Sequence, residues 1–452
     1  MLTDTIAAIA TSTASSGAIS IIRVSGDNAI SVVDKIFRGN NLTLQKSHTI
    51  HYGHIICPDN NIIIDEVLIM LMKAPKSFTT EDVVEINCHG GAFVTKRILE
   101  IILSNGARHA HAGEFSKRAF LNGRIDLSEA EAIMDIIDAK SNHALELAVN
   151  TLDGRVTKLI HNLRDDILDI IANIEVNIDY PEYDEVEIMT NEILLPKTTA
   201  IHNDMIKLLQ AAKTGQLLKN GIKTAIIGRP NVGKSSLLNQ LMREEKAIVT
   251  DIAGTTRDTV EGFINIGGLT LNLIDTAGIR HTDDIVESIG VEKSKKLIEE
   301  AELILLVLNA NENLTFQDQE LLEITKNKNR LILLNKSDLN QEIDIKAIPS
   351  HILTSMTNEK DIMTIENEIK SLFKITDIKP DDTFIYNTRH LALLNQSKKA
   401  IESAIEQMQL SIPIDMVEID LKQAWSFLGD ILGINASESL IDELFTKFCL
   451  GK

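Results

Sequence analysis

The sequence predicts a multidomain protein that combines an α+β domain, an all-α domain and an α/β domain, and three observations lead to this fold class. The 452-residue chain is too long for one compact domain. Short apolar runs alternate with turn signals over residues 1–118, whereas apolar residues at helical spacing dominate residues 119–215 and 379–452. Over residues 216–378, strand-like runs alternate with helical segments, which is typical of a mostly parallel sheet. We therefore expect one helical domain whose two halves flank an inserted α/β domain.

The N-terminal segment is expected to form a small α+β domain. Strand-like apolar runs occupy residues 18–24, 62–72 and 83–88. Residues 93–104 follow them with helical periodicity. The change of period within so short a segment predicts strands that pack with a helix.

The helical segments carry their own start and stop signals. Ser128 is placed to cap the first helix, with Glu131 three residues later at the spacing of a capping box. Helical periodicity continues over residues 145–178, is interrupted at Pro181, and resumes over residues 193–218. Because the termini of a compact domain often lie close together, another domain can be inserted between two such halves.

Composition and charge argue against several classes of protein. The longest apolar run, residues 303–308, is much shorter than a membrane span and predicts a buried strand. The N-terminus lacks the basic and apolar regions of an export signal. A net charge of −20 argues against a stand-alone nucleic-acid-binding protein, because such proteins rely on basic surfaces. Three cysteines without CxxC spacing (Cys57, Cys88 and Cys449) favour a reducing compartment, so we expect a cytoplasmic protein.

A glycine-rich loop at residues 228–235 predicts a nucleotide site. Its sequence is Gly-Arg-Pro-Asn-Val-Gly-Lys-Ser, and it lies between a β-branched apolar run and a helical segment, the context of a phosphate-binding loop. The loop amides and the helix N-terminus would bind the β-phosphate. Lys234 would direct its charge at the β- and γ-phosphates, and the Ser235 hydroxyl would ligate Mg²⁺. Alone, the loop predicts only a bound nucleotide.

Three further elements follow this loop at the distances of a guanine-nucleotide site. The polar loop 251–258 contains Thr255-Thr256, one of which would complete the magnesium shell. The sequence Asp-Thr-Ala-Gly at 275–278 would place a carboxylate near Mg²⁺ and an amide near the γ-phosphate. The sequence Asn-Lys-Ser-Asp at 335–338 follows an apolar run, and the Asp338 carboxylate can accept hydrogen bonds from guanine N1–H and the 2-amino group. Adenine offers no such pair of donors, so GTP is the expected nucleotide.

A weaker candidate for the last base-contacting loop is Ser355-Met356, which follows another apolar run. Together these elements predict a set of GTP contacts. These residues are Asn231, Val232, Gly233, Lys234, Ser235, Ser236, Thr250, Asp251, Ile252, Ala253, Gly254, Thr255, Thr256, Asp275, Thr276, Ala277, Gly278, Asn335, Lys336, Asp338, Ser355 and Met356.

The residue after the Asp-Thr-Ala-Gly element indicates unconventional hydrolysis. Many switch GTPases have a glutamine there that orients the attacking water. This chain has Ile279, which cannot form a hydrogen bond with water. Another residue must therefore orient the water, and Asp283, Asp284 and Glu287 are all candidates on the sequence alone.

Over essentially its whole length the chain resembles the tRNA-modification GTPases known as MnmE or TrmE. The closing Phe-Cys-Leu-Gly-Lys at 448–452 resembles the Cys-x-Gly-Lys end of that family. The segments 113–115, 118–124 and 126–132 resemble its signature at the entry to the helical domain, and residues 251–258 resemble its switch loop. The resemblance implies an N-terminal folate-binding domain that forms a homodimer, a discontinuous helical domain and an inserted Ras-like GTPase domain.

The resemblance also implies partners and a reaction. Such a protein acts with the flavoprotein MnmG (GidA), which carries FAD, in a heterotetramer. Together they would add an aminomethyl or carboxymethylaminomethyl group to C5 of the wobble uridine of certain tRNAs. The one-carbon unit would come from a tetrahydrofolate derivative. The flavoprotein would supply much of the RNA contact, which agrees with the acidic balance of this chain, and no membrane contact is implied.

For the folate site, the resemblance implies that 5-formyltetrahydrofolate contacts Arg23, Glu81, Arg124 and Lys452. Arg124 stands where a lysine is common, which preserves the charge but changes the geometry of hydrogen bonding. The chain also departs from the family at residues 13–18, where Pro-Pro-Gly-Arg-Gly-Gly is usual and Thr-Ala-Ser-Ser-Gly-Ala is present. That loop is less basic than in the family.

For the GTPase domain, the resemblance implies a K⁺ ion that neutralises charge developing between the phosphates, as an arginine finger does elsewhere. It implies Glu287 as the water-orienting residue and Thr256, with Ser235, as the magnesium ligands. The implied K⁺ ligands are Asn231, Thr250, Ile252 and Thr255.

Cys449 has two interpretations. A cysteine at the apolar end of a helix is usually a small buried hydrophobe. Its position three residues from the terminal Lys452 makes a nucleophilic role an equal alternative.

A different function also fits the GTP site, namely a ribosome-assembly GTPase that binds rRNA. Such a switch would be expected to carry a basic appendage, but residues 379–452 contain 7 basic and 11 acidic side chains.

Overall fold

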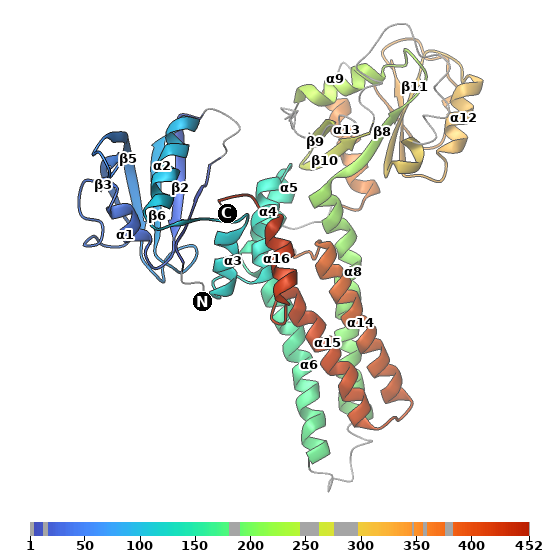
Figure 1. Ribbon diagram of the computed structural model, residues 1–452. Helices are drawn as coiled ribbons and strands as arrows, with labels where there is room; N and C mark the ends of the chain where they lie inside the picture. The colour runs from blue at the N-terminus through green and yellow to red at the C-terminus, as the bar shows by residue number, and fades with distance from the viewer. Residues whose placement is uncertain are drawn as a thin grey trace. The chain divides into compact units, whose positions relative to one another are not determined.

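The computed structural model of the chain (Figure 1) describes residues 4–11, 17–179, 190–244, 262–274, 297–345, 348–355, 359–375 and 383–451. It divides into two compact units. Unit 1 comprises Met1–Met134, Leu152–Leu168 and Trp425–Lys452, and unit 2 comprises Asp135–Thr151 and Asp169–Ala424. The division into segments 1–118, 119–215, 216–378 and 379–452 stays a prediction.

The N-terminal part of unit 1 is built on a seven-stranded sheet in the order β3-β4-β5-β6-β2-β1-β7. Neighbouring strands are antiparallel except β1 and β7, which are parallel. The strands are β1 (Ile6–Ile9), β2 (Ile19–Ser25), β3 (Phe37–Arg38), β4 (Thr49–Ile56), β5 (Ile63–Met72), β6 (Val83–His89) and β7 (Arg108–His109). The strands expected near residues 18–24, 62–72 and 83–88 are confirmed.

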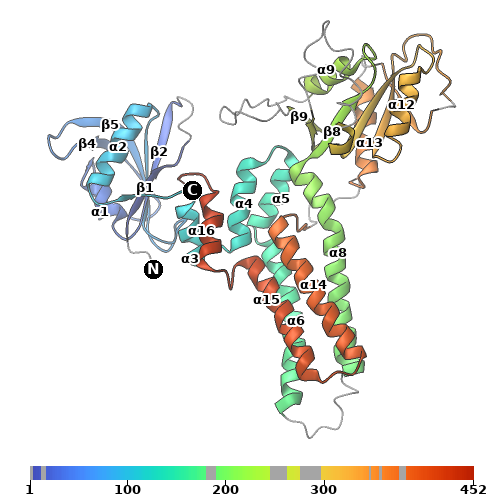
Figure 2. The same ribbon diagram turned by 45° about the vertical axis from the view of Figure 1, so that its right-hand side comes forward.

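Two helices cover this sheet, α1 (Ala29–Asp34) and α2 (Ala92–Ser104), and α2 confirms the helix expected near residues 93–104. Their apolar residues join those of the strands in one core, in which Val84, Ile86 and Cys88 alternate along β6. Figure 2 shows α2 lying across the strands. The apolar residues that alternate along the strands and those at helical spacing on α2 are therefore buried against each other in one core.

The C-terminus of the chain returns to unit 1. Helix α16 (Glu438–Thr446) packs on α3 (Glu114–Leu121) and on the start of α4 (Leu127–Asp138). Phe445 lies at the centre, with ring centroids 6.2 Å from Phe120 and 4.9 Å from Phe448. An ion pair between Lys117 and Asp442 borders this apolar contact. Helices from opposite ends of the sequence thus share one core.

The helix cap expected at Ser128 is wrong, because Asp126 caps α4. The backbone N–H of Glu129 donates to Asp126 Oδ1 (2.8 Å), and the backbone N–H of Asp126 donates to Glu129 Oε2 (2.9 Å). This is a capping box two residues earlier than predicted. The Ser128 hydroxyl instead donates to Asp126 Oδ1 (2.7 Å). A carboxylate next to the first buried residue of the helix accepts from two donors and is favoured by the helix dipole, so it displaces the serine as cap.

Unit 2 contains a six-stranded sheet in the order β13-β12-β11-β8-β10-β9, in which only the pair β9–β10 is antiparallel. The fully buried β11 confirms the strand expected from the apolar run at 303–308. The strands are β8 (Ile222–Ile227), β9 (Gly262–Ile266), β10 (Leu269–Leu273), β11 (Leu303–Asn309), β12 (Arg330–Asn335) and β13 (His351–Leu353), and the helices beside them are α9 (Lys234–Glu244), α12 (Phe316–Ile324) and α13 (Glu359–Leu372).

Long helices make up the remainder of unit 2. Helix α8 packs along α14 and leads directly into β8, as Figures 1 and 2 show. The helices are α5 (Asn142–Leu152), α6 (Arg155–Asp179), a short π-helix (Thr190–Leu194), α8 (Leu195–Asn220), α14 (Thr388–Gln409) and α15 (Ile414–Leu432), of which α5, α6 and α15 each continue into unit 1. No helix within the described ranges is both long and apolar enough to cross a membrane.

The contact between α3 and α16 makes a testable prediction about stability. Gly113, the N-cap of α3, has φ +68°, and a Cβ there would overlap the backbone carbonyl oxygen of Phe445. Gly123 has φ +72°, but a Cβ added there would meet no atom within 4 Å, so it is a matched control. We expect Gly123→Ala to cost about 1 kcal/mol of backbone strain. Gly113→Ala should cost roughly 1–3 kcal/mol more, because the overlap adds to the strain.

Trp425 is the chain's one tryptophan and lies in unit 1, so its fluorescence during urea unfolding reports on this unit. Equal unfolding midpoints for the two alanine variants would show that the approach of Phe445 to Gly113 contributes no measurable stability.

Candidate functional site

The predicted phosphate loop has the expected place in the sheet. It joins the carboxyl end of the parallel strand β8 to the N-terminus of α9, where loop amides and the helix dipole favour an anion. The Lys234 ammonium folds back over the loop and donates to the carbonyl oxygens of Gly228 (2.9 Å) and Arg229 (2.7 Å). Burial lowers the pKa of Lys234, because the charged ammonium loses hydration. A phosphate would restore a favourable partner for this charge.

A side-chain hydrogen bond joins the phosphate loop to the predicted base-binding loop. Asn335, buried at the end of β12, donates through Nδ2 to the carbonyl oxygen of Val232 (2.8 Å). The next residue, Gly233, has φ +106°, and a Cβ there would overlap Asn335 Nδ2. A glycine is therefore required for the two loops to approach each other. Asn335 and Val232 are 103 residues apart in the sequence, and this bond brings their loops together.

The two base-binding candidates are also joined to each other. The backbone N–H of Ser337 donates to the carbonyl oxygen of Thr354 (3.1 Å). The backbone N–H of Thr354 in turn donates to the carbonyl oxygen of Leu334 (2.9 Å). The N–H of Ser355 donates to the Asp361 carboxylate (2.8 Å), a contact the sequence did not suggest. Asp338 is exposed, so its carboxylate is open to a base. The structure thus brings 335–338 and Ser355 to the edge of the sheet that carries the phosphate loop.

Several predicted site residues lie outside the described part of the chain. They include the predicted switch loop, the Asp-Thr-Ala-Gly element with Ile279, and the three candidates for orienting water. These residues are Thr250, Asp251, Ile252, Ala253, Gly254, Thr255, Thr256, Asp275, Thr276, Ala277, Gly278, Ile279, Asp283, Asp284, Glu287, Met356 and Lys452.

In unit 1, three of the four predicted folate contacts meet at one loop, residues 77–81. The guanidinium groups of Arg23 and Arg124 both lie over the Phe78 ring, 5.7 and 5.8 Å from its centroid. Arg124 also donates through Nη1 to the carbonyl oxygen of Ser77 (2.6 Å). The Glu81 carboxylate at the end of the loop accepts from the Ser25 hydroxyl of β2 (2.7 Å). Two cations from other segments, together with a carboxylate and an aromatic ring of the loop itself, therefore lie at a single loop.

The chain's C-terminal tail reaches the same site. Arg23 donates through Nη1 to the carbonyl oxygen of Gly451 (3.2 Å), and it pairs with Glu85 through Nε and Nη2 (both 2.8 Å). The N–H of Gly113 donates to the carbonyl oxygen of Cys449 (3.3 Å). Cys449 itself is exposed, so the interpretation as a buried hydrophobe is wrong, whereas a nucleophilic role stays a prediction. The tail is fixed through its main chain, and the thiol is left accessible.

Two residues at this site were not assigned a role by sequence analysis. Phe78 lies between the two arginines, and Arg118 is 1% exposed although it is charged. Arg118 belongs to the signature segment 118–124, but a sequence does not show that an arginine is buried. Its burial, with partners at Asp4, Glu81 and Glu114, depends on contacts between distant parts of the chain that only the fold brings together.

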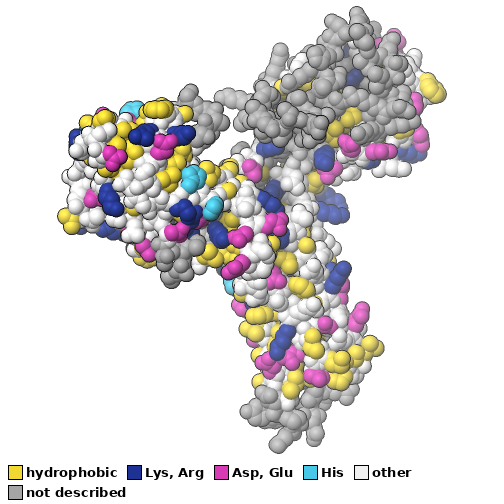
Figure 3. Space-filling view, viewed as in Figure 1, with side chains coloured by type: hydrophobic (Ala, Val, Ile, Leu, Met, Phe, Trp, Pro, Cys, Tyr) yellow, Lys and Arg dark blue, Asp and Glu magenta, His cyan; other side chains and the backbone are white. Residues whose placement is uncertain are grey.

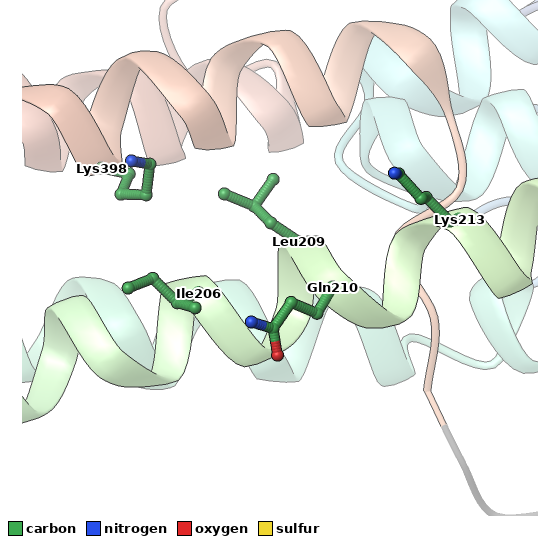
Figure 4. Close-up of a pocket in the computed structure, with 5 residues that line it drawn as sticks. All are labelled: Ile206, Leu209, Gln210, Lys213 and Lys398. Carbon is green, nitrogen blue, oxygen red and sulfur yellow. The ribbon is translucent and has the colours of Figure 1, made fainter.

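An open groove of about 370 Å³ lies between α8 and α14 in unit 2. Figure 4 shows Leu209 of α8 directed toward α14, with Lys398 on the facing helix. None of the predicted site residues lines this groove; its lining is Ile206, Leu209, Gln210, Lys213 and Lys398. It is separate from the nucleotide site and was not predicted from the sequence.

The mostly parallel sheet, with the predicted phosphate loop and the predicted base-binding loop at one edge, is that of a P-loop GTPase. The family models that match are the MnmE helical domain, over residues 127–449, and the N-terminus of GTP-binding protein TrmE, over residues 5–124. The tRNA modification GTPase MnmE of Bacillus mycoides is 53% identical over 456 residues, which cover 99% of both chains. That of Bacillus cytotoxicus is 52% identical with the same coverage. The chain belongs to the MnmE family of tRNA modification GTPases, which confirms the resemblance.

Among solved structures, the crystal structure of Era in complex with MgGDPNP and 16S ribosomal RNA nucleotides aligns with 40% of this chain and 66% of its own. The identity is 27% and the TM-score is 0.25.

The base-binding loop makes a prediction about nucleotide choice. Asp338→Asn should lower affinity for GTP by about a hundredfold, because an amide cannot accept from both guanine donors, and a charged hydrogen bond contributes roughly 1.5–3 kcal/mol. The same variant should gain affinity for xanthosine triphosphate, whose 2-oxo group accepts from the new amide. Titration with fluorescent analogues of both nucleotides measures this exchange. Lys234→Ala is the control and should bind neither; unchanged GTP affinity in Asp338→Asn would exclude Asp338 from the base site.

Proposed function

We propose that this protein hydrolyses GTP and that, with the flavoprotein MnmG, it adds an aminomethyl or carboxymethylaminomethyl group to C5 of the wobble uridine of certain tRNAs. The observation that carries the proposal is that the chain has two chemically different sites within one family framework. Unit 2 has the phosphate loop and the guanine-selective loop. Unit 1 has a carboxylate and an aromatic ring on the loop 77–81, and two arginines from other segments that contact the aromatic ring. A GTPase that acted only as a switch would have no use for the second site.

The second site is proposed to bind a tetrahydrofolate derivative, which supplies the one-carbon unit. The residues that would hold it are Arg23, Glu81, Arg124 and Lys452. The chemistry of the described members fits such a molecule, because guanidinium groups pair with carboxylates and the Glu81 carboxylate accepts from ring N–H groups. The exposed Cys449, three residues before the C-terminus, is the proposed nucleophile. The altered loop 13–18 lies mostly outside the described residues.

For hydrolysis, we assign Mg²⁺ to Ser235 and Thr256 and a K⁺ ion to Asn231, Thr250, Ile252 and Thr255. The K⁺ would neutralise charge between the phosphates. Glu287 would orient the attacking water, because Ile279 cannot. Ser235 and Asn231 lie in the described phosphate loop, and the exposed Asn231 is accessible to an ion there.

The proposed assembly is a homodimer that forms a heterotetramer with MnmG, which carries FAD. The tRNA would be held in large part by that partner. On the face drawn in Figure 3, the described basic side chains are interspersed with acidic ones. The net charge of −20 likewise disfavours extensive RNA contact by this chain alone. The free cysteines agree with a location in the cytoplasm.

The reaction makes a prediction about tRNA. In a strain that lacks the gene, wobble uridines should lose the C5 aminomethyl-type side chain, and the intact gene should restore it. A gene with Cys449→Ser should not restore it, although the purified variant should hydrolyse GTP at the wild-type rate. Mass spectrometry of tRNA nucleosides measures the first result. A normal profile in the deletion strain would contradict the tRNA function; restoration by the serine variant would contradict only the role of Cys449.

The metal assignment makes a prediction about salt. GTP hydrolysis should be faster in KCl than in NaCl at equal ionic strength, because the smaller Na⁺ fits a site of main-chain and amide ligands less well. Phosphate release under steady-state conditions measures the rate. Asn231→Ala should reduce the difference between the two salts, and equal rates for the wild-type protein in both would remove the role of K⁺.

A further inference from the structure

We propose that Arg118 is a positioning residue that orients the Glu81 carboxylate for folate binding. This inference rests on the proposed folate site. Arg118 does not reach the ligand, because its side chain is 1% exposed. Glu81 is 11% exposed, so it is the member of the pair that a ligand can touch. Any effect of Arg118 on binding must therefore pass through Glu81.

The contacts of Arg118 fix the carboxylate at two points. Its Nη1 donates to both oxygens of Glu81, at 3.0 and 3.3 Å, and to the backbone carbonyl oxygen of Asp4 (2.8 Å). Its Nη2 donates to the Asp4 carboxylate (2.8 Å) and to Glu114 (3.1 Å). The planar guanidinium is thus anchored on one side by Asp4 and Glu114 and presents the other side to Glu81. A lysine has one nitrogen and could not serve all these partners at once.

The charges of the cluster leave Glu81 dependent on Arg118. Two arginines, Arg108 and Arg118, face three carboxyl groups. Burial favours the neutral acid at Asp4 and at Glu114, but hydrogen bonds and charge from the two arginines hold the pKa of both below the usual range. Among the described residues, Arg108 forms ion pairs only with Asp4 (2.7 Å) and Glu114 (2.6 Å). Arg118 is the one cation in the described structure that pairs with Glu81.

Glu81 keeps capacity for a ligand after these contacts. A carboxylate offers about four acceptor positions. The Ser25 hydroxyl and Arg118 Nη1 occupy Oε2, and Arg118 Nη1 also contacts Oε1. At least one position on Oε1 remains, and the contacts on either side decide its direction. This position suits the N–H donors of a pterin ring. A buried N–H donor that lacks an aligned acceptor costs binding free energy, so the direction of the carboxylate matters.

Arg108 provides a matched control within the same cluster. It shares Asp4 and Glu114 with Arg118, but none of its contacts within the described ranges reaches Glu81. Arg108→Lys and Arg118→Lys both keep one positive charge and both lose a planar fork. They differ in whether the fork that is lost contacts Glu81.

The test is the affinity of the full-length protein for 5-formyltetrahydrofolate, measured by isothermal titration calorimetry. Arg118→Lys should bind about tenfold more weakly or worse, and Arg108→Lys should remain within about twofold of the wild type. Glu81→Gln should also bind weakly, and the double variant Glu81→Gln with Arg118→Lys should bind no more weakly than Glu81→Gln alone. That lack of additivity is expected only if Arg118 acts through Glu81.

Unfolding followed by Trp425 fluorescence separates this role from a merely structural one. If Arg118 only stabilised the fold, the two lysine variants would lose affinity in proportion to their unfolding midpoints, and the double variant would show additive losses. Either result would overturn the inference, as would wild-type affinity in Arg118→Lys. Should Arg118→Lys lose its cooperative transition, Arg118→Gln takes its place, because its amide keeps two planar donors. A wild-type protein that binds no folate would overturn the proposed folate site itself.

Discussion

The return of the chain's C-terminus to its N-terminal part is the constraint on which unit 1 depends. Phe445 and Phe448 pack with Phe120 near the end of α3, and the tail beyond them reaches Arg23 on β2. Residues 428 positions apart are therefore in direct contact. The GTPase sheet lies in sequence between the segments that make up unit 1, so it interrupts that unit along the chain. The same contact brings the Cys449 segment to the loop 77–81.

The nucleotide site depends on a comparable but smaller contact. Asn335 is the last residue of β12 and contacts the loop that follows β8. Strand β11 lies between β12 and β8 in the sheet. The hydrogen bond to Val232 is buried, so breaking it would leave a buried carbonyl oxygen without its donor. The residue that marks the base-binding motif thus also shapes the phosphate loop. One amide group therefore joins the predicted base-binding loop to the predicted phosphate loop.

The nucleotide site could be predicted from the sequence because its elements are local. Strand, loop and helix follow one another between Ile222 and Glu244, and each has its own periodicity. The second site could not be derived in this way. Arg23, Glu81 and Arg124 were indicated by resemblance, and Phe78 and Arg118 gained their roles only from the fold. Burial of a charged side chain depends on partners distant in the sequence, which no local pattern contains. The cap of α4 was misplaced for a related reason: Ser128 and Asp126 both have suitable side chains, and the backbone geometry selects between them.

The segment 113–124 shows why a short signature can be specific. Glu114 and Arg118 enter the cluster that reaches Glu81, and Asn122 donates to the carbonyl oxygen of Thr79 (2.7 Å). Arg124 completes the set at Ser77. Arg118, Asn122 and Arg124 thus reach one loop from α3 and the turn after it, while Phe120 of the same helix packs with Phe445 of α16. We expect a substitution at Glu114, Arg118 or Asn122 to disturb the candidate folate site, although none of these three is a proposed ligand contact. The residues of this signature are therefore those through which helix α3 and the turn after it support the loop 77–81. None of the contacts named here involves the GTP site.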